Sequence, residues 1–242
     1  MNKKLIFSEK IISFFNDLDF TGSLPEGISI MNPFRDNPEI MPVISSFYRK
    51  FYNDSGPRKI ILGINPGRFG AGVTGIPFTD TKRLAEKCGL TIHGLNTFET
   101  SSVFVYEMID AFGGVEKFYD SFFISAVCPL GFTSRSKNGK ELNYNYYDSS
   151  KLIIAVKDFI ISSLTEQLNF GIDRDVCYCL GTGKNYDFLL KLNAENKFFE
   201  NIIPLEHPRY IMQYKSRQKD YYITKYIDSF NMQTSKPADK II

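Results

Sequence analysis

LGINPGRFGAGVTGIPF, residues 62–78, holds five of the chain's 17 glycines, together with two prolines and two phenylalanines. It overlaps the end of an apolar run, KIILGI at 59–64, which has the length of a buried strand. Glycine permits positive φ values and lets other groups approach the backbone closely. The stretch therefore predicts a long turn at the end of a strand, with bare backbone available to a flat ligand or a neighbouring segment.

Three further apolar runs, at 122–128, 176–180 and 201–207, have the same strand-like length and are bounded by turn residues. Helical patterns lie between and around them. The patterns at 101–112 and 148–168 begin with serine caps, and the others cover 4–17, 38–53, 185–193 and 215–230. Strands that alternate with helices favour a three-layer α/β/α fold with a central, mostly parallel four-stranded sheet.

Composition places the chain among ordinary globular proteins. Its 242 residues are 43% apolar and 23% charged, and we expect a single domain over 1–232 with an N-terminal helical extension and a flexible tail at 233–242. No apolar run is long enough to span a bilayer, and the N-terminus has no signal-peptide cleavage site, so a cytoplasmic location is predicted. The four cysteines lack metal-ligand spacing, and we expect no metal site.

In open α/β sheets, ligands bind beyond the carboxyl ends of the strands. This rule selects four places: Asn65 onward, Cys128 onward, 181–183, and His207 with Pro208. The glycine-rich turn lies at the first of them, so it is the leading candidate for a binding site.

Two nucleotide-binding motifs match the sequence only superficially. Gly70, Gly72 and Gly75 have G-x-G-x-x-G spacing, but the strand ends five residues earlier and Pro77 would break the helix that the third glycine should open. The segment 180–185, LGTGKN, lacks the first glycine and the hydroxyl residue of a phosphate loop. Backbone amides, the Asn65 side chain and the Phe78 ring suit a nucleobase better, although Asn-Pro-Gly is also an ordinary turn sequence.

The turn resembles the first motif of the single-strand-selective monofunctional uracil-DNA glycosylases, a branch of the uracil-DNA glycosylase superfamily. That motif runs hydrophobic-N-P-G-x-F-G-x-x-x-T-G-hydrophobic-P-F. It is matched by Asn65, Pro66, Gly67, Phe69, Gly70, Thr74, Gly75, Pro77 and Phe78. The segment at 122–132 and the sequence Glu206-His207-Pro208 resemble two later motifs of the family, so the resemblance covers about residues 59–226.

The resemblance implies a monofunctional DNA glycosylase that removes uracil or a related deaminated base from DNA, without a cofactor and as a monomer. Asn65 would orient the attacking water, and His207 would donate a hydrogen bond to the base as negative charge grows on it. Phe78 would stack on a base that has left the duplex, and backbone N–H groups near Gly67 would read its edge.

Two departures from the family pattern bear on specificity. Ala126 stands where the family has the asparagine that reads uracil, so Ser125 or backbone groups would have to replace it, and a deaminated purine such as xanthine or hypoxanthine becomes an alternative substrate. His207-Pro208 is not followed by Ser-Pro-Arg, which leaves Arg209, Tyr210 or Ile211 as the side chain that fills the gap left by the base.

Basic residues support a DNA substrate. Residues 131–140 and 207–219, expected as loops at the strand ends, carry seven Lys or Arg and no Asp or Glu. The predicted DNA contacts are Arg68, Arg135, Lys137, Arg209, Tyr210, Lys215 and Arg217. Solvated surface loops explain the same charge pattern. Tyr144, Tyr146 and Tyr147 are candidates either for stacking on bases or for core packing, and His93 is expected to be structural or exposed.

Two other classes of function are kept as alternatives. A DNA-binding or damage-sensing protein would retain the pocket without catalysis, but it would not need both Asn65 and His207. A nicotinamide or flavin enzyme would carry a cofactor with a characteristic absorbance. The sequence favours the glycosylase over both.

Overall fold

A computed structural model describes residues 5–232; the predicted tail at 233–242 lies outside them. The central sheet has four parallel strands in the order β3 (Phe122–Ala126), β2 (Arg58–Gly63), β6 (Ile172–Leu180) and β7 (Asn201–Leu205). These are the four strands that the apolar runs predicted. All of β3 and most of β2 are buried because helices cover both faces, which is why apolar residues dominate their sequences.

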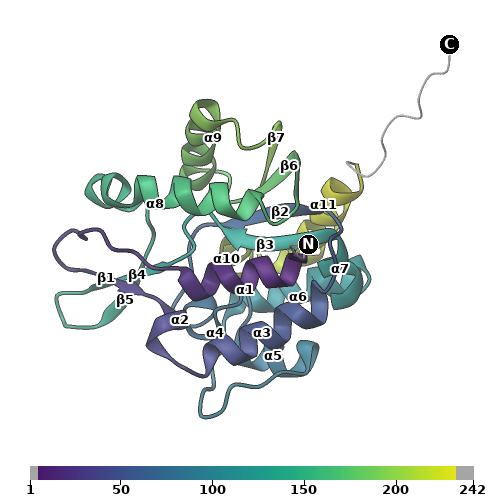
Figure 1. Cartoon of the computed structure of the whole chain (residues 1–242), viewed down its shortest axis with the longest axis horizontal. Coiled ribbons are helices and arrows are strands. Elements are labelled where there is room, and N and C mark those ends of the chain that lie inside the picture. The colour runs from purple at the N-terminus through teal and green to yellow at the C-terminus, as the bar shows by residue number, and fades with distance from the viewer. Residues whose placement is uncertain (1–4, 233–242) are drawn as a thin grey trace.

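Helices cover the two faces of the sheet (Figure 1). On one face, α1 (Phe7–Asp17) and α8 (Ser150–Leu168) contact each other, and Phe7 of α1 packs against Phe123 of β3. On the other face lie α6 (Thr100–Phe112) and α11 (Lys219–Met232), whose Phe230 ring is 4.6 Å from that of Phe122. The predicted three-layer α/β/α architecture is therefore confirmed.

The remaining helices are shorter or lie at the edges of these layers. They are α2 (Pro33–Asp36), α3 (Ile40–Phe51), α4 (Ala71–Thr74), α5 (Thr81–Cys88), α7 (Val115–Ser121), α9 (Lys184–Asn196), α10 (Pro208–Tyr214) and the 3-10 helix η1 (Ser216–Gln218). Within residues 5–232, no helix combines the length and the apolar character that crossing a membrane requires.

Of the two helix starts predicted to have serine caps, the structure has a serine cap at one and not at the other. Ser149 caps α8, because its side chain accepts a hydrogen bond from the Leu152 N–H at 3.3 Å. The cap residue of α6 is Glu99 and not a serine. Ser102 instead accepts a hydrogen bond from the Asp80 N–H, so its hydroxyl ties two segments together and starts no helix.

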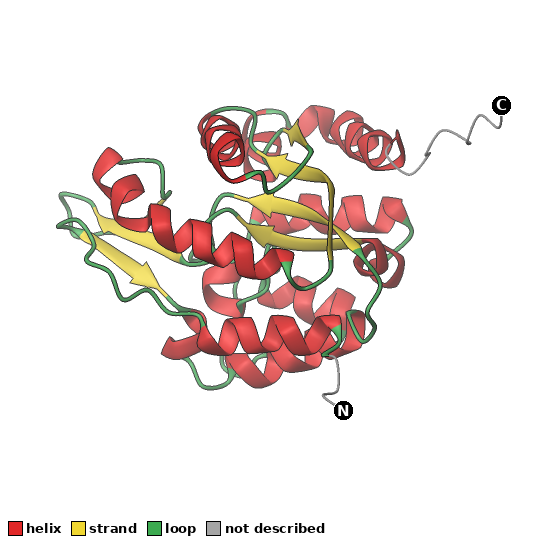
Figure 2. Cartoon of the chain, turned by 45° about the horizontal axis from the view of Figure 1, so that its top comes forward, coloured by secondary structure: helices red, strands yellow, loops and turns green. Residues whose placement is uncertain are grey.

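A second, antiparallel sheet was not predicted. It consists of β1 (Ile28–Met31), β4 (Gly131–Arg135) and β5 (Glu141–Tyr144), with β4 in the middle, and Figure 2 shows it beside the central sheet. The prediction of a loop at 131–140 is thus wrong in detail, because this segment forms β4 and the tight turn into β5. The hairpin stands beside the glycine-rich turn. A Cβ added to Gly131 of β4 would lie only 2.5 Å from the Pro66 carbonyl oxygen, so the glycine allows the two backbones to approach closely.

Candidate active site

A cavity of about 350 Å³ opens at the carboxyl ends of β2 and β3. The turn after β2 and the junction between β7 and α10 form two of its walls, and the end of β5 forms a third. The cavity lies where sheets of this type place their ligands. It brings together Asn65, Gly67, Phe78, Ser125, Ala126, His207, Arg209 and Tyr210, all of which the sequence singled out.

Hydrogen bonds within the glycine-rich turn fix its shape. The N–H groups of Gly70 and Gly72 both donate to the Gly67 carbonyl, at 3.1 and 2.9 Å, and the chain then forms the single helical turn α4. The buried Thr74 hydroxyl donates to the Thr79 carbonyl at 2.6 Å and accepts from the Ile76 N–H. These bonds bend the chain back toward the sheet, so that Phe78 reaches the cavity.

Phe78 has an unusual backbone, with φ at +53°. Its ring lies 5.6 Å from that of His207, at an angle of 50°. A Cβ on Gly63 would come within 2.9 Å of the Phe78 ring, so the glycine at the end of β2 gives the ring its place. Strained residues of this kind persist where surrounding structure fixes them, and here the strain places an aromatic face at the cavity.

The Asn65 side chain is held by the end of β5. Its Nδ2 donates to the carbonyl groups of Tyr144 and Pro66, each at 3.3 Å, and its Oδ1 accepts from the Tyr146 N–H at 3.1 Å. An amide oxygen can accept two hydrogen bonds, so Oδ1 keeps one lone pair for another partner. The amide is thus oriented in advance, with an acceptor position to spare.

His207 is poised as a neutral donor. Its Nδ1 accepts a hydrogen bond from the Arg209 N–H at 3.1 Å, which assigns the ring proton to Nε2. Burial, together with the positive charge of Arg209, lowers the pKa of His207 to about 4. At neutral pH the imidazole is therefore uncharged and carries one N–H available for donation.

The base-reading role predicted for the Ser125 hydroxyl is not supported by its position. Ser125 lines the cavity, but its hydroxyl points to the α8 side of the sheet and donates to the buried Gln167 side chain. Side chains alternate along a strand, so Ala126 faces the same side as Phe78 and Ser125 the opposite side. Ala126 and backbone groups are what β3 presents to a ligand.

The structure adds polar residues that sequence reasoning missed. Asn143 of β5 and Asn145, just after this strand, line the cavity, and Asn143 accepts a hydrogen bond from the Arg68 N–H at 3.0 Å. Glu99, the cap residue of α6, also lines it. The alternation of asparagine and tyrosine at 143–146 was the signal for the first two, but without the hairpin nothing placed them near Asn65.

The predicted DNA contacts form two groups. Arg209 and Tyr210 line the cavity and are exposed, while Arg68 follows Gly67 of the cavity lining and has its guanidinium 4.4 Å from the centre of the Phe69 ring. The other four do not line the cavity: Arg135 and Lys137 are exposed on the β4–β5 hairpin, and Lys215 and Arg217 follow α10.

Three other sequence expectations are settled by burial. Ile211 is fully buried, so the prediction that it could fill the gap in a base stack is wrong. Tyr146 is also fully buried and donates to Asn185 at 2.8 Å, which makes it a core anchor. Tyr144 and Tyr147 are partly buried and pack against the core, and His93 is exposed as expected.

Comparisons with known proteins agree with this picture. A model of the uracil DNA glycosylase superfamily matches residues 49–231. The crystal structure of wild-type SMUG2 from Pedobacter heparinus superposes with a TM-score of 0.94 and 55% sequence identity, covering 96% of this chain and 100% of that one. A search of curated proteins gave no match.

Proposed function

The chain belongs to the uracil-DNA glycosylase superfamily, in the SMUG-like branch, and on that premise we propose that the cavity beyond β2 and β3 is its base-excision site. The enzyme is a DNA glycosylase, a hydrolase that acts on DNA. What supports the proposed site is the convergence of a pre-oriented amide, a neutral imidazole donor and an aromatic ring in one cavity. The enzyme would act as a monomer, since one chain supplies the amide, the imidazole and the aromatic ring.

His207 is proposed to stabilise the leaving base. As the bond between C1′ and the base nitrogen breaks, its electron pair moves into the base and negative charge grows on the pyrimidine oxygen. The His207 Nε2–H would donate to that oxygen. This hydrogen bond strengthens as negative charge develops on the oxygen, so His207 would act much as an oxyanion-hole donor does. Removing such a donor typically slows a reaction by about 10² to 10³.

Asn65 is proposed to hold the attacking water. The free lone pair of its Oδ1 would accept a hydrogen bond from the water while the bonds to Tyr144, Pro66 and Tyr146 keep the amide still. When the water is held in line with the reacting carbon, much of the entropy needed to bring the two together is lost on binding and no longer adds to the barrier.

Phe78 is proposed to stack on the base, with Gly67, Ala126 and the Ser125 backbone forming the rest of its pocket. The base must leave the duplex, or already be unpaired, to enter a cavity of this kind. Uracil is the proposed substrate. Asn143 and Asn145 offer amide groups on the cavity wall, whereas Ala126 stands at the position of the family's usual amide.

The proposed DNA path runs over the basic residues beside the cavity. Arg68, Arg135, Lys137, Lys215 and Arg217 would contact phosphates, with Arg209 at the cavity itself. Tyr210 is exposed at the start of α10 and is the proposed side chain for the gap that the flipped base leaves.

The test is a panel of end-labelled oligonucleotides that carry uracil, xanthine or hypoxanthine, single-stranded and double-stranded. We expect strand scission at uracil after alkali and none without it, because hydrolysis leaves an abasic site and no lyase product. His207→Ala should reduce scission by about 10² to 10³. Scission of a purine substrate alone would move the specificity to deaminated purines, and scission without alkali would contradict a monofunctional enzyme.

A further inference from the structure

A carboxylate lies directly beside the glycine-rich turn. A Cβ added to Gly70 would overlap Oε2 of Glu99, and one added to Gly67 would lie 3.3 Å from Oε1. Two glycines of the motif thus make room for the carboxyl group of a residue about thirty positions away in the sequence. Glu99 also lines the cavity that holds Asn65 and His207, and it is the one Asp or Glu among the described residues that do so.

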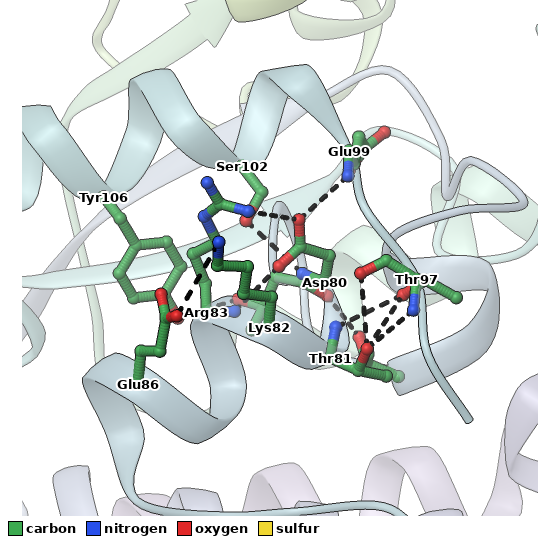
Figure 3. A network of polar contacts seen from close by, with 11 residues as sticks. Asp80, Thr81, Lys82, Arg83, Glu86, Thr97, Glu99, Ser102 and Tyr106 are labelled. Carbon is green, nitrogen blue, oxygen red and sulfur yellow. Dashed lines mark hydrogen bonds and ion pairs between the residues drawn. The ribbon is translucent and has the colours of Figure 1, made fainter. Parts of the chain in front are cut away.

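Partly buried hydrogen bonds hold the backbone of Glu99 in this position (Figure 3). Asp80, the fully buried cap residue of α5, accepts from the Glu99 N–H at 2.8 Å with Oδ2. The same carboxylate accepts from the Arg83 N–H and from its guanidinium, at 2.8 and 3.2 Å. Reciprocal bonds between Thr81 and Thr97 join the same two segments. The backbone that carries Glu99 is therefore fixed, whereas its carboxyl group has no hydrogen-bond partner within residues 5–232.

Charged and titratable groups near Glu99 come from three segments. Asp80, the cap residue of α5, lies beside it and is paired with Arg83; Arg209 and the neutral His207 belong to the β7–α10 junction; Arg68 belongs to the turn but points to Phe69 and Glu141. Burial, then the negative charge of Asp80, raise the pKa of Glu99 to about 7, and Arg209 opposes this rise. A carboxyl group whose pKa is near 7 is suited to exchange a proton during turnover.

The two groups already assigned to the reaction leave a proton without an acceptor. The Asn65 amide orients water but is not a base, and His207 uses Nδ1 for the Arg209 N–H and Nε2–H for the base. Water that attacks C1′ must nevertheless lose one proton. Glu99 is the group in the cavity whose chemistry fits that task.

We propose that Glu99 is a further catalytic residue, whose carboxylate accepts the proton of the attacking water. This inference rests on the proposed site. The C1′–N bond breaks with its electron pair moving to the base, the water oxygen forms the new bond to C1′, and one water proton passes to Glu99. The base anion takes up a proton from solvent, and Glu99 releases its own to solvent, which restores the enzyme.

The test is the single-turnover rate of uracil release from a single-stranded oligonucleotide between pH 5.5 and 8.5. In the wild-type enzyme the rate should rise with pH and level off above about pH 7, because only the carboxylate accepts a proton. Glu99→Gln keeps the size of the side chain and should lower the rate about 100-fold at pH 8 and flatten the profile. Glu99→Asp should retain the pH dependence at a reduced rate.

Two controls separate the outcomes. Glu195→Gln changes a surface glutamate of α9 that pairs with Lys157, and it should leave rate and profile unchanged. Asn65→Ala with a wild-type rate would show that the proposed site itself is wrong. If Asn65→Ala is inactive while Glu99→Gln keeps the wild-type rate and profile, the role of Glu99 is overturned. A flat wild-type profile would overturn it without any variant.

Discussion

His207 shows how one residue depends on its immediate contacts. The Arg209 N–H fixes its tautomer and burial keeps it neutral, so the same environment that makes it a donor also makes its protonation costly. The sequence identified the residue from its place before Pro208. It did not indicate the tautomer, because that follows from the first turn of α10.

The depressed pKa of His207 predicts a loss of stability in acid. An unfolded histidine takes up a proton near pH 6.5, but the folded one does so only near pH 4. As pH falls through this window the unfolded state binds the proton first, so the free energy of unfolding decreases. Between pH 7 and 4.5, the melting temperature of the wild-type protein should fall more than that of His207→Gln. Equal decreases for the two proteins would contradict the assignment.

The close approach of Gly63 to the Phe78 ring predicts that Gly63→Ala lowers both activity and stability. An added methyl group would come within 2.9 Å of the Phe78 ring and push it toward the cavity. We expect Gly63→Ala to slow uracil release about tenfold or more, equivalent to ~1.4 kcal/mol in the barrier, while overpacking costs ~1–3 kcal/mol of stability. Release assays and urea denaturation measure the two effects. Gly183→Ala, where an added Cβ meets nothing, is the control.

At the scale of the element, the start of α5 stabilises the site. Asp80 caps this helix, pairs with Arg83 and holds the backbone of Glu99 (Figure 3). A single buried carboxylate thus connects the turn that carries Phe78 with the segment that leads into α6.

Asp80→Ala should therefore destabilise the protein strongly. Removing the cap costs ~1 kcal/mol, and leaving the partly buried Arg83 without its partner raises the total to ~3 kcal/mol. Asp80→Asn keeps a capping oxygen and should lose less. The midpoint of urea denaturation measures the order. An Asp80→Ala midpoint equal to that of the wild type would show that this network does not stabilise the fold.

The elements differ in how well the sequence predicted them. The four central strands were predictable because each contains a short apolar run, and in β2 and β3 that run is buried along most of its length. The hairpin of β4 and β5 was missed, since β5 carries polar and apolar residues and its turn, 136–140, is rich in lysine, serine and glycine. Missing the hairpin hid the anchor of Asn65 and the placement of Asn143. Glu99 was missed for a similar reason, because only tertiary packing brings it to the turn.

At the scale of the whole molecule, two segments that supply residues to the cavity also carry basic residues outside it. Arg135 and Lys137 stand on the hairpin whose β5 strand lines the cavity with Asn143, and Lys215 and Arg217 follow α10, whose first turn lines it with Arg209. The overall charge of +2 conceals this concentration. Local charge, and not net charge, therefore supports DNA binding.

This arrangement predicts a defined salt dependence. Arg135→Ala combined with Lys137→Ala should reduce the slope of log affinity against log salt by about 1.4 on single-stranded DNA, because each lost phosphate contact contributes ~0.7. Fluorescence anisotropy with a labelled oligonucleotide measures the slope. Lys157→Ala, on α8 and paired with Glu195, should leave it unchanged. A double variant with the wild-type slope would remove the hairpin from the DNA path.

The central claim is that the cavity at the carboxyl ends of β2 and β3 excises the base, and the single-turnover rate of uracil release by Asn65→Ala tests it most directly. Asn65 is oriented by three hydrogen bonds and lines the cavity. We predict a rate at least about 100-fold below wild type, with DNA affinity unchanged, because the variant loses its water-orienting group. A wild-type rate in a folded Asn65→Ala protein would contradict the claim and place the chemistry elsewhere.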